Sequence, residues 1–486
     1  MNFVKPMTLT PLALNLRPIR LSAALSVATA ALLISGCASN FNAPYQAPAL
    51  TIPVQYSQDN ATAVADAGVA VPTAPGTLWW TRFNDPELDR LVAEVLQRNN
   101  NLAAAAIRVR RAQLLAGLAD NNLQPSFSGS VVTGTTLPLQ AGAVSTPISR
   151  ASIGAAYEID LWNRLGSLRD VAGWEALATE QDRQSTALAL VGTTASLYWQ
   201  LGFLNQRLAA NAQSIAYAQT TFNLVQAQYR AGAVSGLEVA QAQQTLASQQ
   251  ASQSVFLQLT FEARTALALL FDGPPGSSLA NPASLPDLAL PLLDAGVPAA
   301  LLGRRPDLRA AELRLRATFT GIDATRASYY PAFSLTGSLG STSAQLSSVL
   351  QNPAAALGLS VSLPFLQRTA MQLNIRVSET LYEEAVVNFR QTLYTALGDV
   401  DNALSSRQQL AQQGLRLDET LQAARTAERL YEIRYRAGAA TLSLWLDAQE
   451  RRRTADIALA TNQLARLNNQ VTVYKALGGD AAVMLP

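Results

Sequence analysis

The sequence predicts a mixed α and β fold built from two tandem copies of one pattern, and three observations support this prediction. The pentapeptide Tyr-Arg-Ala-Gly-Ala at 229–233 recurs at 435–439, which places the two copies 206 residues apart. Two stretches with helical patterning, 163–229 and 367–435, run for 67 and 69 residues without a proline. Before each of them, short segments alternate apolar with polar residues, as half-buried strands do.

The composition excludes most hydrolase mechanisms. The chain has 486 residues, a net charge of +2, no histidine and one cysteine. Without histidine, the usual general base, the usual zinc and copper ligands, and serine–histidine or cysteine–histidine nucleophiles are missing. A net charge this close to zero does not attract nucleic acid. We therefore expect no catalytic residue, no cofactor, no metal and no nucleic-acid partner.

Residues 1–36 have the composition of a signal peptide. Basic residues precede an apolar run of 14 residues at 21–34, which is shorter than the ~20 residues of a membrane-spanning helix. The run leads through Leu-Ile-Ser-Gly to Cys37, a pattern that resembles the bacterial lipobox. The resemblance implies a lipoprotein whose mature chain begins at an acylated Cys37 carrying palmitate or a similar chain. Several acyl chains anchor a protein firmly, whereas one anchors it only marginally. The alternative is a buried free thiol.

The first repeat is expected over 84–271, after a tether over 37–83 whose prolines favour an extended segment lying on other structure. Asp85, Pro86 and Glu87 predict a helix start, because they supply an N-cap, a first-turn proline and an acid facing the helix dipole. Further elements follow in order: a helix over 102–123, strands at 126–137 and 152–161 around a loop at 138–147, the long helix over 163–229 and a returning helix over 237–271.

The second repeat is expected over 304–478, after a proline-rich linker over 272–303 and before a tail over 479–486. Pro306 and Asp307 predict the start of its first helix. Asp307 and Glu312 are five residues apart, so they do not lie side by side, and capping is favoured over an acid–base pair. Strands are predicted at 333–339 and 357–363 around a loop at 340–353, then the long helix over 367–435 and a returning helix over 444–477.

Apolar residues recur at heptad spacing along both long helices, which predicts coiled-coil seams. The glycine of each Tyr-Arg-Ala-Gly-Ala is expected to adopt a left-handed conformation that ends the long helix, so each pentapeptide is a hairpin tip. The seam residues are Leu197, Leu201, Leu204, Leu208, Ile215 and Phe222 in the first helix, and Leu410, Leu417, Leu421, Ala424 and Tyr431 in the second.

Four short strands are too few to close a barrel, and a barrel in lipid must close because lipid cannot satisfy an open sheet edge. Several chains must therefore contribute strands. Two chains would give eight strands and a filled lumen, whereas three would give twelve with room for a pore. The apolar strand residues expected to face lipid are Ile153, Tyr157, Leu335, Leu359 and Val361.

Several motifs together resemble the outer-membrane efflux lipoproteins of the OprM/NodT type, within the TolC superfamily. These are the lipobox, both Tyr-Arg-Ala-Gly tips, Tyr157-Glu158-Ile159-Asp160-Leu161-Trp162, Arg304-Arg305-Pro306-Asp307 and Tyr330-Pro331-Ala332-Phe333-Ser334-Leu335-Thr336-Gly337. The resemblance implies a homotrimer with a 12-stranded outer-membrane barrel, a 12-helix periplasmic tunnel, and an equatorial belt formed by the termini and linker. It further implies the exit channel of a tripartite efflux pump of the RND type, which exports drugs or other small molecules.

The implied partners are a periplasmic adaptor protein, an inner-membrane transporter and the lipid of a Gram-negative outer membrane. Other functions stay open at this stage. A coiled-coil structural lipoprotein of the envelope would account for the heptads and the acylation but not for the alternating strands. A duct for type I protein secretion or for metal efflux would share the fold.

The same resemblance places a periplasmic gate just after the second tip. There Leu444 and Asp447 are three residues apart and share a helix face, so a trimer would turn them into an apolar and an anionic ring. A solvated helix face is the alternative for Asp447. The corresponding acid of the first repeat is Glu238, for which a capping box with Ser235 is favoured. Tyr435 and Arg436 are the candidates for holding the tip closed.

Overall fold

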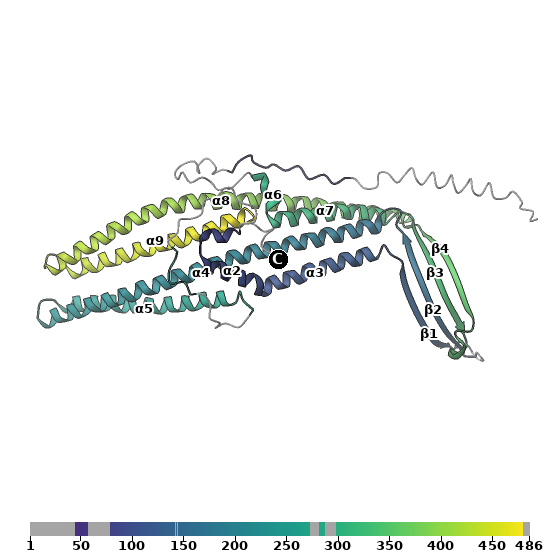
Figure 1. Cartoon of the computed structure of the whole chain (residues 1–486), viewed down its shortest axis with the longest axis horizontal. Helices are drawn as coiled ribbons and strands as arrows, with labels where there is room; N and C mark the ends of the chain where they lie inside the picture. Colours follow the sequence, from purple (N-terminus) through teal and green to yellow (C-terminus); the bar gives the residue numbers. More distant parts are fainter. Residues whose placement is uncertain are drawn as a thin grey trace, which may run out of the picture. The chain divides into compact units, whose positions relative to one another are not determined.

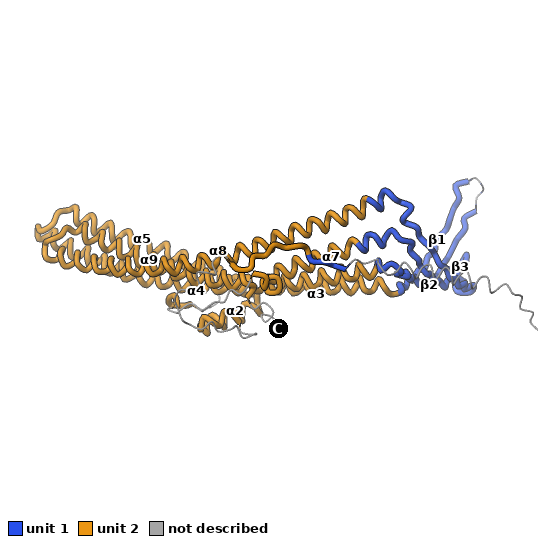
Figure 2. Tube along the Cα trace, turned by 90° about the horizontal axis from the view of Figure 1, so that it is seen from above, with its two compact units in different colours: residues 1–47, 125–164, 323–372 blue, residues 48–124, 165–322, 373–486 orange. Residues whose placement is uncertain are grey.

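A computed structural model of the chain describes residues 44–56, 78–140, 142, 144–272, 281–286 and 298–479. Two compact units are present (Figure 2), and each contains parts of both predicted repeats. One unit holds residues 125–164 and 323–372 with the strands, while the other holds most of the helical residues. The predicted signal peptide and Cys37 lie outside the described residues.

The first unit is organised around one antiparallel sheet with the strand order β1-β2-β3-β4 (Figure 1). Each strand pairs with the next one along the chain, so Tyr157 lies opposite Leu335, and Leu335 lies opposite Leu359. The four predicted strands are therefore confirmed. Their bounds are Ser126–Thr136 for β1, Thr146–Ile159 for β2, Ala332–Ser343 for β3 and Pro353–Ser362 for β4.

The loop predicted at 340–353 is wrong at both ends. Residues 340–343 continue β3, because they pair with residues 149–152 of β2. Pro353 already belongs to β4 and lies opposite Ser341. The sequence here is rich in glycine, serine and alanine, which lack a clear apolar alternation, yet backbone pairing requires no particular side chain. Likewise β2 begins at Thr146, inside the loop predicted at 138–147.

The second unit consists mainly of helices, and the predicted long helices are confirmed with a shift of one residue. α4 (Arg164–Arg230) has 67 residues and α8 (Arg368–Arg436) has 69. The remaining helices of eight or more residues are α2 (Pro86–Arg98), α3 (Asn100–Asn121), α5 (Gly236–Ala268), α7 (Pro306–Ala327) and α9 (Leu442–Ala476). Short helical turns are η2 (Trp79–Phe83), η3 (Pro298–Ala300), α6 (Leu301–Arg304), η4 (Leu346–Ser348) and η5 (Pro364–Leu366).

The predicted helix starts are confirmed by hydrogen bonds. The Asp85 carboxylate accepts from the amides of Glu87 and Leu88 at 3.1 Å, which makes it the N-cap of α2. At α7, the Leu308 amide donates to Asp307 Oδ1 at 2.9 Å. Asp307 also pairs with Arg305 at 2.7 Å, whereas Glu312 pairs with Arg316 at 2.7 Å. The two carboxylates thus have separate partners, as the capping interpretation requires.

The helical unit has its largest core where α2, α4 and α9 meet η2. Trp79 stacks on Tyr474 with ring centroids 5.0 Å apart, and Phe83 contacts Trp199 at 4.8 Å. The tether predicted over 37–83 is therefore too long, because Trp79, Trp80 and Phe83 near its end are buried in this core. All the predicted seam residues of α4 and α8 are buried or half-buried, which agrees with the coiled-coil prediction.

One described part of the linker, residues 281–286, packs on α4. Asn205 Nδ2 donates to the Pro282 carbonyl at 2.8 Å. A Cβ atom at Gly202 would lie 2.7 Å from the Ser284 carbonyl oxygen, so only glycine permits this close approach. Among the described helices, α4 alone has a segment long and apolar enough to cross a membrane, and 67% of that segment is buried. Such burial is typical of a core helix.

Candidate functional site

Each Tyr-Arg-Ala-Gly-Ala forms the tip of a helical hairpin (Figure 1). Gly232 and Gly438 both have φ = +73°, in the left-handed region, as predicted. The Gly232 amide donates to the Tyr229 carbonyl at 2.9 Å, and the Ala233 amide donates to the Gln228 carbonyl at 2.9 Å. The second tip repeats this pattern with Gly438 and Ala439. The two tips thus have the same backbone structure.

Glu238 completes a capping box at the start of α5. Its carboxylate accepts from the Ser235 amide at 3.0 Å, while the Ser235 hydroxyl oxygen accepts from the Leu237 amide at 3.2 Å. The hydrogen bond from the Ser235 hydroxyl lowers the pKa of Glu238. The predicted capping role is confirmed, and it leaves this carboxylate occupied within its own helix.

A hydrogen bond joins the two hairpins beside their tips. The Tyr435 hydroxyl on α8 donates to Gln228 Oε1 on α4 at 2.8 Å. Burial, together with the nearby charge of Glu238, raises the pKa of Tyr435, so the hydroxyl stays protonated and able to donate at neutral pH. Arg436 instead pairs with Glu432, one turn back on its own helix, at 2.6 Å. Of the two predicted candidates for holding the tip, Tyr435 is the one that reaches the first hairpin.

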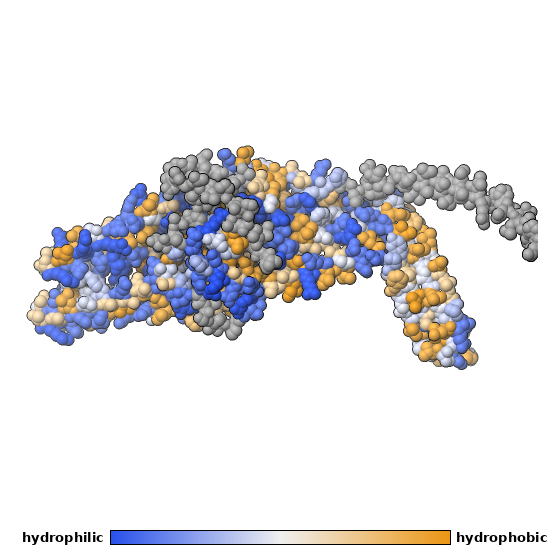
Figure 3. Space-filling model, in the orientation of Figure 1, coloured by the Kyte–Doolittle hydropathy of each residue, from blue (hydrophilic) through white to orange (hydrophobic). Residues whose placement is uncertain are grey.

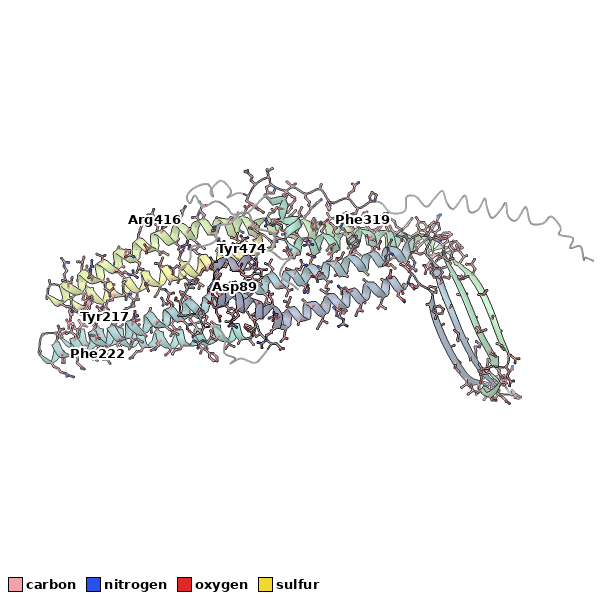
Figure 4. All side chains as sticks on the ribbon, in the orientation of Figure 1. Asp89, Tyr217, Phe222, Phe319, Arg416 and Tyr474 are labelled. Carbon is pink, nitrogen blue, oxygen red and sulfur yellow. The ribbon has the colours of Figure 1, made fainter. Side chains whose placement is uncertain are left out.

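Trp445 extends this contact into an aromatic cluster that the sequence analysis missed. Its ring stacks on Tyr435 with centroids 5.1 Å apart and meets Tyr217 of α4 edge-on at 6.0 Å. Trp445 is 2% exposed and packs with Val225 of α4 and Ala242 of α5. The side chains in Figure 4 place Tyr217 on the α4–α5 hairpin. Burial raises the pKa of Tyr217 to about 12.

Leu444 and Asp447 lie on the exposed face of α9, opposite the face that buries Trp445. Asp447 is paired within the helix, since Arg451 Nε donates to its Oδ2 at 2.9 Å. The shared helix face expected for Leu444 and Asp447 is therefore present. A ring built from Asp447 would consist of ion pairs rather than of bare carboxylates, which reduces the charge expected at this level.

The strand register separates two sheet faces. The five residues expected to face lipid share one side of the sheet. Tyr157 and Leu359 are each paired with Leu335, and the other two lie an even number of residues along their strands. The other side carries Glu158, Ser334 and Ser360, which form a row across three strands. Figure 3 shows apolar side chains gathered over the strands. One face thus suits lipid and the other suits water.

The described residues contain no group of three or more histidine, cysteine, aspartate or glutamate side chains placed to hold a metal ion. A sheet with one apolar and one polar face, in a chain with very long seamed helices, is the build of an envelope channel protein. The chain belongs to the outer membrane efflux protein family, whose model matches residues 91–271 and 297–479. The family resemblance seen in the sequence is confirmed.

Known relatives match most of this chain. The chain is 33% identical over 429 residues to the pyoverdine export outer membrane protein OpmQ of Pseudomonas putida, covering 85% of this chain and 91% of that one. It is 30% identical over 405 residues to toxin and drug export protein A of Aggregatibacter actinomycetemcomitans, covering 82% and 88%. The crystal structure of CusC superposes with a TM-score of 0.80 at 25% identity, over 90% of this chain and 99% of that one. The protein is an outer-membrane efflux channel and not an enzyme.

Proposed function

We propose that three copies of this chain close a 12-stranded barrel in the outer membrane, continued by a 12-helix periplasmic tunnel. This proposal rests on the two free edges of the sheet. Among the described residues, β1 and β4 each pair with a single strand, so each has an unpaired edge. An unpaired edge cannot stay in lipid, because its amide and carbonyl groups would have no partners. Pairing β4 of one copy with β1 of the next satisfies every edge.

Exposed apolar residues on two helices support the same assembly. α3 and α8 carry large apolar side chains that the single chain leaves uncovered, and neighbouring copies would cover them. These residues are Ile107, Leu114, Leu115 and Leu118 on α3, and Leu373, Val377, Leu381, Val387 and Tyr394 on α8.

Three chains fit an exit duct better than two. Eight strands would enclose only side chains, whereas twelve would leave a lumen. The polar face with Ser334 and Ser360 would line that lumen, and the apolar face would contact lipid. A coiled-coil structural lipoprotein, the alternative from another class, would have no use for a sheet with two such different faces.

Native mass spectrometry of the detergent-extracted protein tests the assembly directly. We expect a single species with the mass of three chains, and we expect this species to form channels in planar lipid bilayers. A dimer, or a trimer that never conducts when reconstituted, would contradict the proposed duct.

The trimer would receive its cargo from an inner-membrane transporter of the RND type through a periplasmic adaptor. The relatives OpmQ and toxin and drug export protein A are named for pyoverdine export and for toxin and drug export, and CusC is named a cation efflux system protein. We propose drugs or other small molecules as the cargo of this chain. Protein secretion and metal efflux are the alternatives that the same duct would serve.

We expect Cys37 to be the acylated first residue of the mature protein. Mass spectrometry of the N-terminal peptide should find acyl chains on Cys37. The Cys37→Ser variant should lose the lipid anchor of its N-terminal segment while the trimer still assembles in the membrane, because the barrel holds itself in the bilayer. A mature chain that starts elsewhere, or a Cys37 without acyl chains, would contradict this expectation.

We further propose that the periplasmic end is closed at rest. The Tyr435–Gln228 hydrogen bond and the Trp445 cluster would hold the second hairpin against the first, and three such hairpin pairs would close the tunnel. Leu444 and Asp447, on the exposed face of α9, would form the constriction. Glu238 and Arg436 would act only through their own helices, where their partners are Ser235 and Glu432.

The Asp447→Ala variant tests the constriction. If three Asp447 side chains line the axis, removing them should lower the preference for cations over anions in planar bilayers. The change should be modest, because each carboxylate is already paired with Arg451 at 2.9 Å. Arg451→Ala is the matched variant and should shift selectivity the other way, toward cations. Unchanged selectivity in both variants would move the constriction elsewhere and leave Asp447 as surface.

A further inference from the structure

A cavity of about 690 Å³ lies between the two hairpins of the helical unit. Residues of α4, α5, α8 and α9 line it, so its walls come from both hairpins. The lining contains five arginines and four carboxylates. A volume of this size matches the sites that hold small organic molecules, which occupy about 300–1,000 Å³.

The carboxylates of the cavity are engaged with known partners. Glu428 pairs with Arg452 at 2.7 Å, and Glu450 pairs with Arg453. Asp456 lies 3.6 Å from Arg425. The fourth, Glu432, pairs with an arginine outside the cavity at 2.6 Å. All four carboxylates of the cavity therefore already have an arginine partner, and none is left to neutralise the remaining arginines.

Two cavity arginines, Arg207 on α4 and Arg429 on α8, have no carboxylate within 4.0 Å among the described residues. Arg207 is half-buried, and its guanidinium carbon lies 4.7 Å from the centroid of the Phe256 ring. Burial lowers the pKa of Arg207 although the charge of Asp456 opposes this. Stacking uses the flat face of the guanidinium and leaves its N–H groups available as donors.

We propose that this cavity binds a small polyanion with carboxylate or phosphate groups, which bridges Arg207 of the first hairpin and Arg429 of the second. A guanidinium donates two parallel hydrogen bonds to a carboxylate or phosphate, so it is the side chain best suited to such a ligand. Two or more anionic groups are needed because the two arginines belong to different hairpins. The ligand would add a link between the hairpins that the chain itself does not supply.

Isothermal titration calorimetry on the full-length trimer in detergent tests this site, with citrate and pyrophosphate as probes and sodium chloride as the ionic-strength control. We expect saturable binding of at least one probe, with one site per chain. Binding of citrate alone assigns a ligand with carboxylate groups, and binding of pyrophosphate alone assigns a ligand with phosphate groups. The Arg207→Gln and Arg429→Gln variants should each weaken binding by roughly tenfold, because each loses a charge-assisted hydrogen-bond donor.

Arg416→Gln is the matched control. Arg416 also lies on α8 (Figure 4), but its side chain is 79% exposed, pairs with Glu419 at 2.8 Å and does not line the cavity. This variant should bind the probe as the unaltered protein does. The proposal is wrong if neither probe saturates, or if Arg429→Gln, whose exposed position leaves folding intact, binds as tightly as the control. Because calorimetry reads ligand binding and not conduction, its result is independent of the proposed gate.

Discussion

Replacing Leu359 with Arg is expected to prevent most of the protein from reaching the trimeric state. Leu359 lies opposite Leu335 on the apolar face of the sheet, and it is 65% exposed in the single chain. An arginine facing lipid at mid-membrane costs about 2–4 kcal/mol, and a trimer would incur this cost three times. An arginine in place of Leu357, which lies nearer the middle of β4, should show the full cost of a charge facing lipid. The trimer fraction extracted from outer membranes and its urea midpoint would measure the effect.

Ser360→Arg is the matched control for this prediction. Ser360 neighbours Leu359 on the same strand but belongs to the opposite face, next to Ser334. An arginine there would face the water-filled lumen and should leave assembly intact while changing ion selectivity. If both variants assemble equally well, the apolar face does not contact lipid and the proposed orientation of the sheet is wrong.

Much of the fold could be predicted from the sequence because its signals are local and repeated. Uninterrupted helical patterning located both long helices to within one residue. Alternation located β2 through residues such as Ile153 and Tyr157. It failed at 340–343, where glycine and serine pair through backbone groups alone. It also failed at Trp79, because burial depends on contacts with distant Tyr474, which no local pattern encodes.

The candidate gate was harder to predict because its contacts cross between repeats. Tyr435 could be singled out as a part of the repeated tip, but its partner Gln228 lies 207 residues away. The sequence contained one signal that could have identified Trp445 as a contact residue. Leu442, Trp445 and Ala448 are spaced three residues apart and form a buried stripe along α9. This stripe lies on the other side of the helix from Leu444 and Asp447. Leu444 and Asp447, the residues expected to form rings, belong to the exposed stripe, whereas the contact between the hairpins comes from the buried one.

Trp445→Ala is expected to loosen the second hairpin and to open the resting channel. Truncating a buried tryptophan to alanine costs about 3–5 kcal/mol. Here the loss would fall on the cluster that joins Trp445 to Tyr435 and to Tyr217 of the first hairpin. We expect a higher resting conductance in planar bilayers, and greater sensitivity of the cells to large hydrophilic antibiotics that would enter through the open duct.

Graded variants separate this local loosening from general unfolding. Trp445→Phe keeps an aromatic ring and should conduct only slightly more than the unaltered channel at rest, while Tyr435→Phe loses just the hydroxyl that bonds to Gln228 at 2.8 Å. The second change should cost about 0.5–1.5 kcal/mol and raise conductance less than Trp445→Ala does. Thr461→Ala, at an exposed position of α9 far along the helix from the tip, is the control and should behave as the unaltered protein. If Trp445→Ala lowers the melting temperature of the trimer but leaves its resting conductance unchanged, the cluster stabilises the hairpin pair without closing the duct. The closure would then have to come from contacts between the three chains.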